Sequence, residues 1–133
     1  MSTAFRALVC DDDVTFRAIV KRILEERGID VVEAADGQEA TNLFLKEKFD
    51  LVVTDFLMPK IDGLQLVRNI KLSSPHGRDI PVILMSAISK VHVEQELAGI
   101  GPDYYLNKPF RPKKLAKILD KVIGELSRRQ RQD

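Results

Sequence analysis

Cysteine is nearly absent from this sequence of 133 residues, with Cys10 as its single example. No disulfide can therefore form within the chain, and a reducing compartment such as the cytoplasm fits this composition. No run approaches the roughly 18 apolar residues of a membrane-spanning helix, and the start of the chain lacks the apolar stretch of a signal peptide. Neither sign of charge dominates, because 21 Lys and Arg face 20 Asp and Glu and leave +1. The overall charge gives no reason to expect a membrane or a nucleic acid as a direct partner.

The charge is uneven only near the C-terminal end. Residues 111–133 hold eight Lys and Arg but three Asp and Glu, a balance of +5 that leaves −4 for the rest. The composition, 44% hydrophobic and 31% charged, is ordinary for a globular domain. We expect one domain over residues 1–127 and a polar, basic tail over 128–133.

Short apolar runs alternate with amphipathic stretches along the whole chain. Strands are predicted over 7–10, 31–32, 51–54, 81–85 and 103–106. Helical spacing of apolar residues predicts helices over 16–24, 38–48, 64–70 and 115–126, and a weakly anchored one over 90–98, with a polar loop at 73–79. This alternation is typical of an α/β protein with a doubly wound parallel sheet. Five strands and five helices favour the flavodoxin-like strand order 2-1-3-4-5.

Side chains capable of chemistry follow four of the five predicted strands. They are Asp11 and Asp12 after the first, Asp55 after the third, Ser86 after the fourth and Lys108 after the fifth. The carboxyl ends of parallel strands share one edge, and the first and third strands are neighbours in this order. Three converging carboxylates repel one another unless cations share the site. Lys108 supplies one cation, and we expect Mg²⁺, which prefers oxygen ligands and keeps several waters, as the other.

Asp55 is expected to be the most enclosed of the three carboxylates, because an apolar run leads into it. A carboxylate can act as a nucleophile toward phosphorus and form an aspartyl phosphate. That reaction needs positioning and charge neutralisation, which Mg²⁺, Lys108 and the Ser86 hydroxyl would supply. Plainer interpretations remain open at this point: Asp11 to Asp13 could simply complement a helix N-terminus, and a lone lysine is usually a surface residue.

Five motifs, in order, together resemble the receiver domain of two-component response regulators. They are Val9-Cys10-Asp11-Asp12, Leu51 to Pro59, Asp62-Gly63, Met85-Ser86-Ala87 and Lys108-Pro109-Phe110. The resemblance covers about residues 5–126. It implies that Asp55 is the phosphoacceptor and that a phosphohistidine on a sensor histidine kinase or phosphotransfer protein is the donor.

The resemblance also implies roles for residues around Asp55. Mg²⁺ would be bound by Asp12, Asp55 and the main-chain carbonyl of Leu57, with Asp11 acting through water. Ser86 and Tyr105 would form a switch pair. The peptide bond between Lys108 and the following proline would be cis.

Three functions compete at this stage. The first is a phosphorylation-dependent signalling switch, a receiver alone that ends after its fifth helix. It would not be an enzyme on other substrates and would act by protein–protein contact. The second is a receiver belonging to a larger DNA-binding regulator or hybrid kinase. The third is a phosphatase with an aspartyl-phosphate intermediate. Such enzymes require a second acid two residues after the nucleophile, and because position 57 is Leu this function is disfavoured.

One surface is expected to change on phosphorylation and to bind a downstream partner. It combines residues 90–98, the strand at 104–106 and the helix that follows Arg111. This helix carries four lysines opposite its apolar stripe, namely Lys113, Lys114, Lys117 and Lys121. Such a face suits an acidic protein partner.

Overall fold

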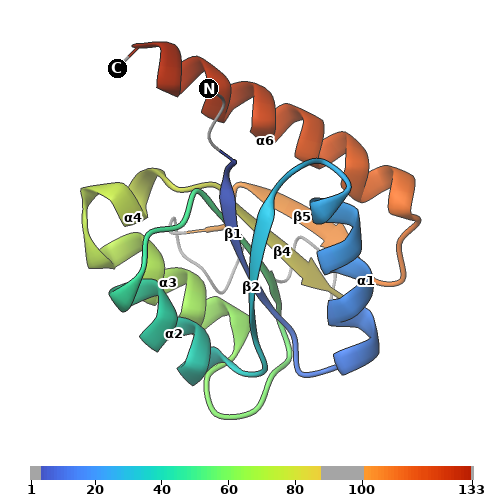
Figure 1. The fold of residues 1–133 in the computed structure, drawn as a ribbon. Helices are drawn as coiled ribbons and strands as arrows, with labels where there is room; N and C mark the ends of the chain where they lie inside the picture. Colours follow the sequence, from blue (N-terminus) through green and yellow to red (C-terminus); the bar gives the residue numbers. More distant parts are fainter. Residues whose placement is uncertain (1–3, 88–100, 133) are drawn as a thin grey trace.

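The computed structural model describes residues 4–87 and 101–132, and its centre is a five-stranded parallel sheet (Figure 1). The strands are β1 (Arg6–Cys10), β2 (Asp30–Ala34), β3 (Leu51–Asp55), β4 (Val82–Ser86) and β5 (Tyr104–Asn107). Their order across the sheet is β2-β1-β3-β4-β5, and every neighbouring pair is parallel. The predicted fold class and strand order are confirmed.

Helices cover both faces of the sheet (Figure 1). They are α1 (Val14–Glu25), α2 (Gly37–Lys46), α3 (Gly63–Ser73), the short α4 (Pro75–Asp79) and α6 (Pro112–Gln132). Residues of β1 divide between the two faces: Ala7 and Val9 pack in a core with α1 and α6, whereas Leu8 and Cys10 pack in a core with α2 and α3. The period of two in a strand thus gives both layers an apolar interior.

Aspartates begin three of these helices. The carboxylates of Asp13, Asp36 and Asp62 accept hydrogen bonds from the main-chain N–H three residues later, at 3.1, 2.8 and 2.9 Å. Such caps satisfy N–H groups that a helix leaves without partners. Beyond the other end of α1, Gly28 has a positive φ of 75°, a left-handed conformation that is typical of a glycine following a helix.

The structure differs from the prediction at residues 73–79. We expected a polar loop, but α3 continues to Ser73 and α4 follows at once. Ser74 caps α4 by accepting a bond from the Gly77 N–H at 3.0 Å, and Pro75 stands at the start of α4, where its missing N–H costs nothing. Pro75 and Gly77, which are residue types typical of loops, are here compatible with a helical turn.

The C-terminal end also differs from expectation. Residues 128–132, expected as a polar tail, continue α6 as far as Gln132, because no glycine or proline interrupts them. Arg129 adds a tertiary contact by donating from Nη1 to the Asp79 carbonyl at 2.9 Å. The weak helix predicted at 90–98 lies outside the described residues. None of the helices in the described ranges combines the length and apolar character that a membrane crossing requires.

Candidate functional site

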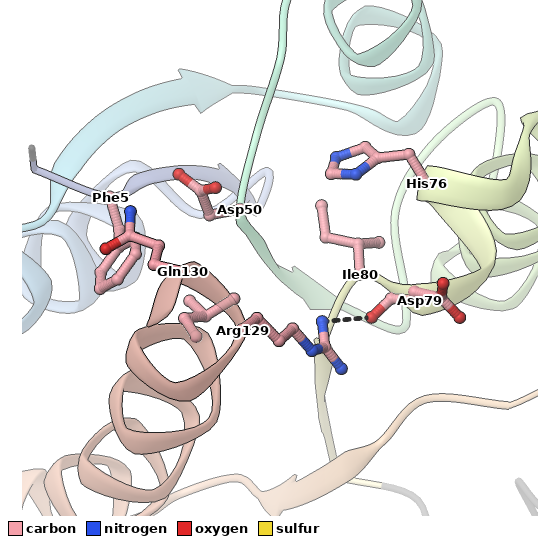
Figure 2. Close-up of a pocket in the computed structure, with 8 residues that line it drawn as sticks. Phe5, Asp50, His76, Asp79, Ile80, Arg129 and Gln130 are labelled. Carbon is pink, nitrogen blue, oxygen red and sulfur yellow. Dashed lines mark hydrogen bonds between the residues drawn. The ribbon is translucent and has the colours of Figure 1, made fainter. Parts of the chain in front are cut away.

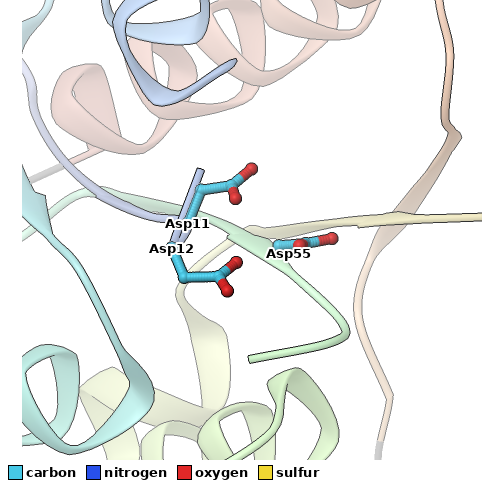
Figure 3. A group of neighbouring side chains, drawn as sticks. All are labelled: Asp11, Asp12 and Asp55. Carbon is cyan, nitrogen blue, oxygen red and sulfur yellow. The ribbon is translucent and has the colours of Figure 1, made fainter. Parts of the chain in front are cut away.

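Three carboxylates meet at the carboxyl edge of the sheet, where β1 and β3 are neighbours. One oxygen each from Asp11, Asp12 and Asp55 lies within 4.8 Å of the others. Figure 3 shows the three carboxyl groups pointing the same way from the ends of their strands. Asp11 is fully buried and Asp55 is 8% exposed, whereas Asp12 is exposed. The predicted convergence is confirmed, although Asp11 is more enclosed than Asp55.

Lys108 joins two of these carboxylates. Its Nζ lies 3.0 Å from Asp11 Oδ2 and 3.2 Å from Asp55 Oδ1. The lysine follows β5 directly, and its main-chain N–H donates to the Ser86 carbonyl at 2.9 Å. The next peptide bond, Lys108–Pro109, is cis, as the sequence resemblance implied. A surface role for this lysine is thereby excluded, because its side chain is only 20% exposed.

Asp11 is held at four points. Its Oδ2 accepts from Lys108, its Oδ1 accepts from the Asp13 N–H at 3.0 Å, and its carbonyl accepts from Arg17 Nη1 at 2.7 Å. Its own N–H donates to Ala34 at 3.2 Å. By contrast, no hydrogen bond or ion pair within residues 4–87 and 101–132 engages the Asp12 carboxylate. Asp12 is therefore the carboxylate most available to a ligand.

Asp55 is fixed less completely than Asp11. Its Oδ1 accepts from the Phe56 N–H at 2.9 Å in addition to its contact with Lys108. Burial raises the pKa of the Asp55 carboxyl above its ordinary value, the neighbouring Asp11 charge raises it further, and Lys108 opposes both. The site thus carries more negative charge than its one ammonium balances.

The donor set suits a hard divalent cation. Carboxylate oxygens are the ligands that Mg²⁺ prefers, and it usually keeps several of its waters, which the exposed position of Asp12 permits. The nearby thiol of Cys10 is no competitor as a ligand or nucleophile. Burial raises its pKa to about 12, so it stays protonated at neutral pH.

Ser86 and Tyr105, the predicted switch residues, occupy adjacent strands. Ser86 ends β4 and is 4% exposed. Tyr105 pairs in register with Leu84 and packs with Phe56 in a small core under α3. Its neighbour Tyr104 faces the other side of the sheet and donates from its hydroxyl to Glu125 of α6 at 2.6 Å. Both tyrosines are thus partly buried, on opposite faces.

Leu57 lies in the loop after β3 and is 62% exposed. The metal-binding role of its carbonyl stays a prediction.

Sequence reasoning missed two residues of α1. Phe16, counted only as part of the apolar stripe, has its ring centroid 4.1 Å from Lys108 Nζ. Arg17 holds the Asp11 carbonyl and is itself held by Glu33 of β2, with 3.0 Å between Arg17 Nε and Glu33 Oε1. The Glu33 pKa is lowered, chiefly by this hydrogen bond from Arg17. The only signal in the sequence was their place one turn after Asp11 and Asp12.

A hollow lies at the end of the sheet opposite the three carboxylates (Figure 2). Its volume is about 390 Å³, and it lies between the C-terminal part of α6 and α4. His76 Nε2 is paired with the Phe49 carbonyl at 2.9 Å, and the Arg129 guanidinium is bound to Asp79. Asp50, which lines the hollow, directly precedes β3, whereas Asp55 lies at the other end of that strand. It takes no part in the carboxylate site.

Comparisons with known proteins agree with the geometry. Residues 7–120 match the response regulator receiver domain family. A probable transcriptional regulator ycf27 of Porphyridium aerugineum is 36% identical over 123 residues, which make up 92% of this chain and 50% of that protein. This chain spans about half the length of the curated relatives it matches.

Two solved structures show the same fold. The chemotaxis response regulator CheY4 of Vibrio cholerae aligns with a TM-score of 0.82 and 30% identity, covering 90% of this chain and 99% of that one. The receiver domain of a sensor histidine kinase of Pseudomonas aeruginosa, solved with a magnesium ion coordinated in its active site cleft, aligns with a TM-score of 0.80 and 26% identity, covering 92% and 99%. The chain belongs to the receiver-domain family of two-component response regulators, whose general function is that of a phosphorylation-dependent signalling switch.

Proposed function

We propose that Asp55 is the residue phosphorylated in this receiver domain. The observation that carries the proposal is the Lys108 ammonium set between Asp11 and Asp55, within a group of three carboxylates that span no more than 4.8 Å. Asp55 ends β3, the middle strand of the sheet, and its contacts with Phe56 and Lys108 use only Oδ1, whereas both carboxylate oxygens of Asp11 are engaged. Receiver domains work with histidine kinases, and a kinase or phosphotransfer phosphohistidine is the donor we propose.

The chemistry asked of these residues is modest. An Asp55 oxygen attacks phosphorus while the P–N bond of phosphohistidine breaks, and the electron pair of that bond stays with the imidazole. We expect Lys108 and the Ser86 hydroxyl to contact the phosphoryl oxygens. Because phosphoryl transfer depends on positioning and charge neutralisation, the hydrogen bond from Phe56 N–H to Asp55 Oδ1 also matters, since it fixes the carboxyl plane.

Mg²⁺ is the cofactor we propose, with Asp12, Asp55 and the Leu57 carbonyl as direct ligands and Asp11 acting through water. When bound, the ion supplies the positive charge that neutralises the phosphoryl oxygens. The two hydrogen bonds that the Asp11 carboxylate accepts, from Lys108 and from the Asp13 N–H, favour its indirect role, whereas the Asp12 carboxylate has no competing partner in the described part of the chain. A relative from Pseudomonas aeruginosa was solved with magnesium in its cleft.

Phosphorylation is tested by incubating the chain with acetyl phosphate and Mg²⁺ and measuring intact mass. We expect a single phosphoryl adduct in the wild type and none in Asp55→Asn. Equal yield in the two proteins would overturn the assignment of Asp55.

The metal ligands are tested by a Mg²⁺ titration followed by NMR. Asp12→Ala should weaken binding strongly, whereas Asp13→Ala is the matched control. Its carboxylate caps α1 instead, accepting from the Phe16 N–H at 3.1 Å. Equal weakening in both variants would show that the ligand is misassigned by one residue.

The output we propose is protein–protein contact through a switch. The phosphoryl group draws Ser86 toward it, and the Tyr105 ring moves into the space behind Ser86. The partner surface includes β5 and the first turns of α6, where a groove of about 520 Å³ is lined by Phe110, Arg111 and three lysines. Its charge fits an acidic partner. The part of this surface predicted at 90–98 lies outside the described residues.

Beryllofluoride, a mimic of the phosphoryl group, tests the switch. Added with Mg²⁺, it should shift amide resonances along β5 and α6 as well as those around Asp55. Shifts confined to the surroundings of Asp55 would contradict the switch while leaving phosphorylation intact.

The cytoplasm is the compartment we propose for this chain, because its one thiol, buried in the structure, stays reduced there.

A second candidate for the output is DNA-binding regulation or a place in a hybrid kinase. The curated relatives of about twice this length are named as probable transcriptional regulators. A reporter assay with the complete gene would separate this from direct protein contact. An enzymatic role as a phosphatase is disfavoured, because Leu57 stands where the second acid would be needed.

A further inference from the structure

The Lys108 ammonium has three N–H groups that can each contact a neighbour. Two directions lead to carboxylates, Asp11 Oδ2 at 3.0 Å and Asp55 Oδ1 at 3.2 Å. A third neighbour is the face of the Phe16 ring, with its centroid 4.1 Å from Nζ. The lysine side chain is only 20% exposed. The ring therefore closes one side of the ammonium that water would otherwise occupy.

The Phe16 ring is itself fixed in place. It meets the Phe110 ring edge to face, at 5.2 Å between centroids and an interplanar angle of 89°. Phe110 follows Lys108 by two residues, so the pair of rings joins α1 to the loop that carries the lysine. This geometry is a favourable one for aromatic pairs.

An aromatic ring suits this position for an electrostatic reason. Its face attracts a cation through the ring quadrupole, yet it adds no further negative charge to a site that already holds three carboxylates. A polar neighbour would compete with the carboxylates for the N–H donors, whereas an aliphatic one would give no attraction. The ring thus stabilises the ammonium without changing the hydrogen bonds.

We propose that Phe16 is a positioning residue for Lys108 in phosphoryl transfer. The inference rests on the proposed function of Asp55. When Asp55 becomes an aspartyl phosphate, its carboxylate charge is lost and Lys108 must turn from Asp55 Oδ1 to the phosphoryl oxygens. The contact with Phe16 involves none of the reacting atoms. It therefore holds the ammonium in the site while its partner changes.

The test measures the rate of phosphorylation by acetyl phosphate at saturating Mg²⁺. Phe16→Leu and Phe16→Met keep an apolar side chain but remove the π face. We expect both to slow the reaction about threefold to thirtyfold. Phe16→Tyr keeps the ring and should retain the rate within about twofold. Mg²⁺ affinity should stay unchanged in all three, since Phe16 is not itself a proposed ligand of the ion.

A double-mutant cycle separates positioning from a general packing role. In a Lys108→Met background, Phe16→Leu should have almost no further effect on the residual rate, because the cation it acts on is gone. Ile23→Val, which trims a buried core residue on the same helix, is the matched control for lost packing. It should lower the unfolding temperature and leave the rate unchanged.

Several outcomes would overturn the inference. They are wild-type rates in Phe16→Leu and Phe16→Met, full slowing of the Lys108→Met protein by Phe16→Leu, or a loss of rate in Ile23→Val as large as in Phe16→Leu. None of these touches the proposed function, which fails separately if Asp55→Asn still takes up the phosphoryl group.

Discussion

Replacement of Gly63 by alanine is expected to disturb both the stability and the chemistry of this domain. Gly63 is the first residue of α3, and its N–H donates to the Phe56 carbonyl at 2.7 Å. A Cβ at this position would overlap the Asp55 carbonyl oxygen and lie 2.8 Å from Phe56 Cα and 3.0 Å from Leu84 Cδ1. The first two are main-chain atoms, so a change of rotamer cannot relieve the contact.

The magnitude follows from competing terms. Overpacking of this kind costs about 1–3 kcal/mol, and alanine returns at most about 1 kcal/mol of helix propensity. We expect the free energy of unfolding to fall by about 1–2 kcal/mol. Because α3 and the end of β3 must move apart, the Asp55 carboxylate also shifts. A displacement of 1 Å at a reacting group can cost about a hundredfold in rate, so phosphorylation should slow at least about tenfold.

Urea denaturation and the acetyl phosphate assay measure these two effects. Gly124→Ala is the control, because its Cβ would meet only Arg128 Nη1, at an ordinary 3.6 Å. Within α6 this change should stabilise the domain by about 0.5–1 kcal/mol. A Gly63→Ala protein with wild-type stability and wild-type phosphorylation would refute the reasoning from close approach.

Two further predictions concern charged side chains away from the carboxylate site. Lys71 is 9% exposed, and its Nζ donates to the Ile80 carbonyl at 2.6 Å and to Asp103 Oδ2 at 2.8 Å. Lys71→Met should cost about 2–4 kcal/mol in urea denaturation, because a buried carbonyl loses its donor; a loss under about 0.5 kcal/mol would contradict this. Glu33 has a lowered pKa owing chiefly to Arg17, so its contribution to stability is present above its unfolded-state pKa and is lost as pH falls through the lower folded-state pKa. The difference in the free energy of unfolding between wild type and Glu33→Gln should therefore shrink below about pH 4.5. At neutral pH this difference should stay under about 1 kcal/mol, because about a third of the Glu33 side chain is exposed. A difference independent of pH would show that the ion pair contributes nothing.

The sheet and its long helices were predictable because their signals are local. Runs of apolar or β-branched residues such as 51–54 predict strands buried on both faces, and the structure buries all four residues. The missed α4 depends on tertiary contacts instead. Gly77 lies so close to the Ile70 carbonyl that a Cβ would overlap it, and Lys71 donates to the Arg78 carbonyl at 3.3 Å. A five-residue helix held in this way leaves no periodic pattern in the sequence.

The site was predictable to the extent that strand ends carry it. Asp55 ends β3 and Lys108 follows β5, and a parallel sheet brings such ends to one edge. Phe16 and Arg17 sit on a helix, where their contacts depend on the rotation of α1 against the sheet. That rotation is set by the packing of Val20 and Leu24 in the core, which sequence spacing locates only as one face of a helix. The contacts of Phe16 and Arg17 with the site could therefore not be predicted from the sequence.

The unequal fixation of the three carboxylates indicates how the site divides its work. Asp11 is fully buried and meets Lys108, Arg17 and the Asp13 N–H, so its geometry is set before any ligand arrives. Asp12 is exposed, which suits the direct contact with an incoming cation that we propose for it. Asp55 lies between these extremes, anchored through one oxygen by the Phe56 N–H and Lys108. The proposed role of Asp55 as the nucleophile fits this intermediate state, because the contacts of its carboxylate use only Oδ1, whereas both carboxylate oxygens of Asp11 are engaged.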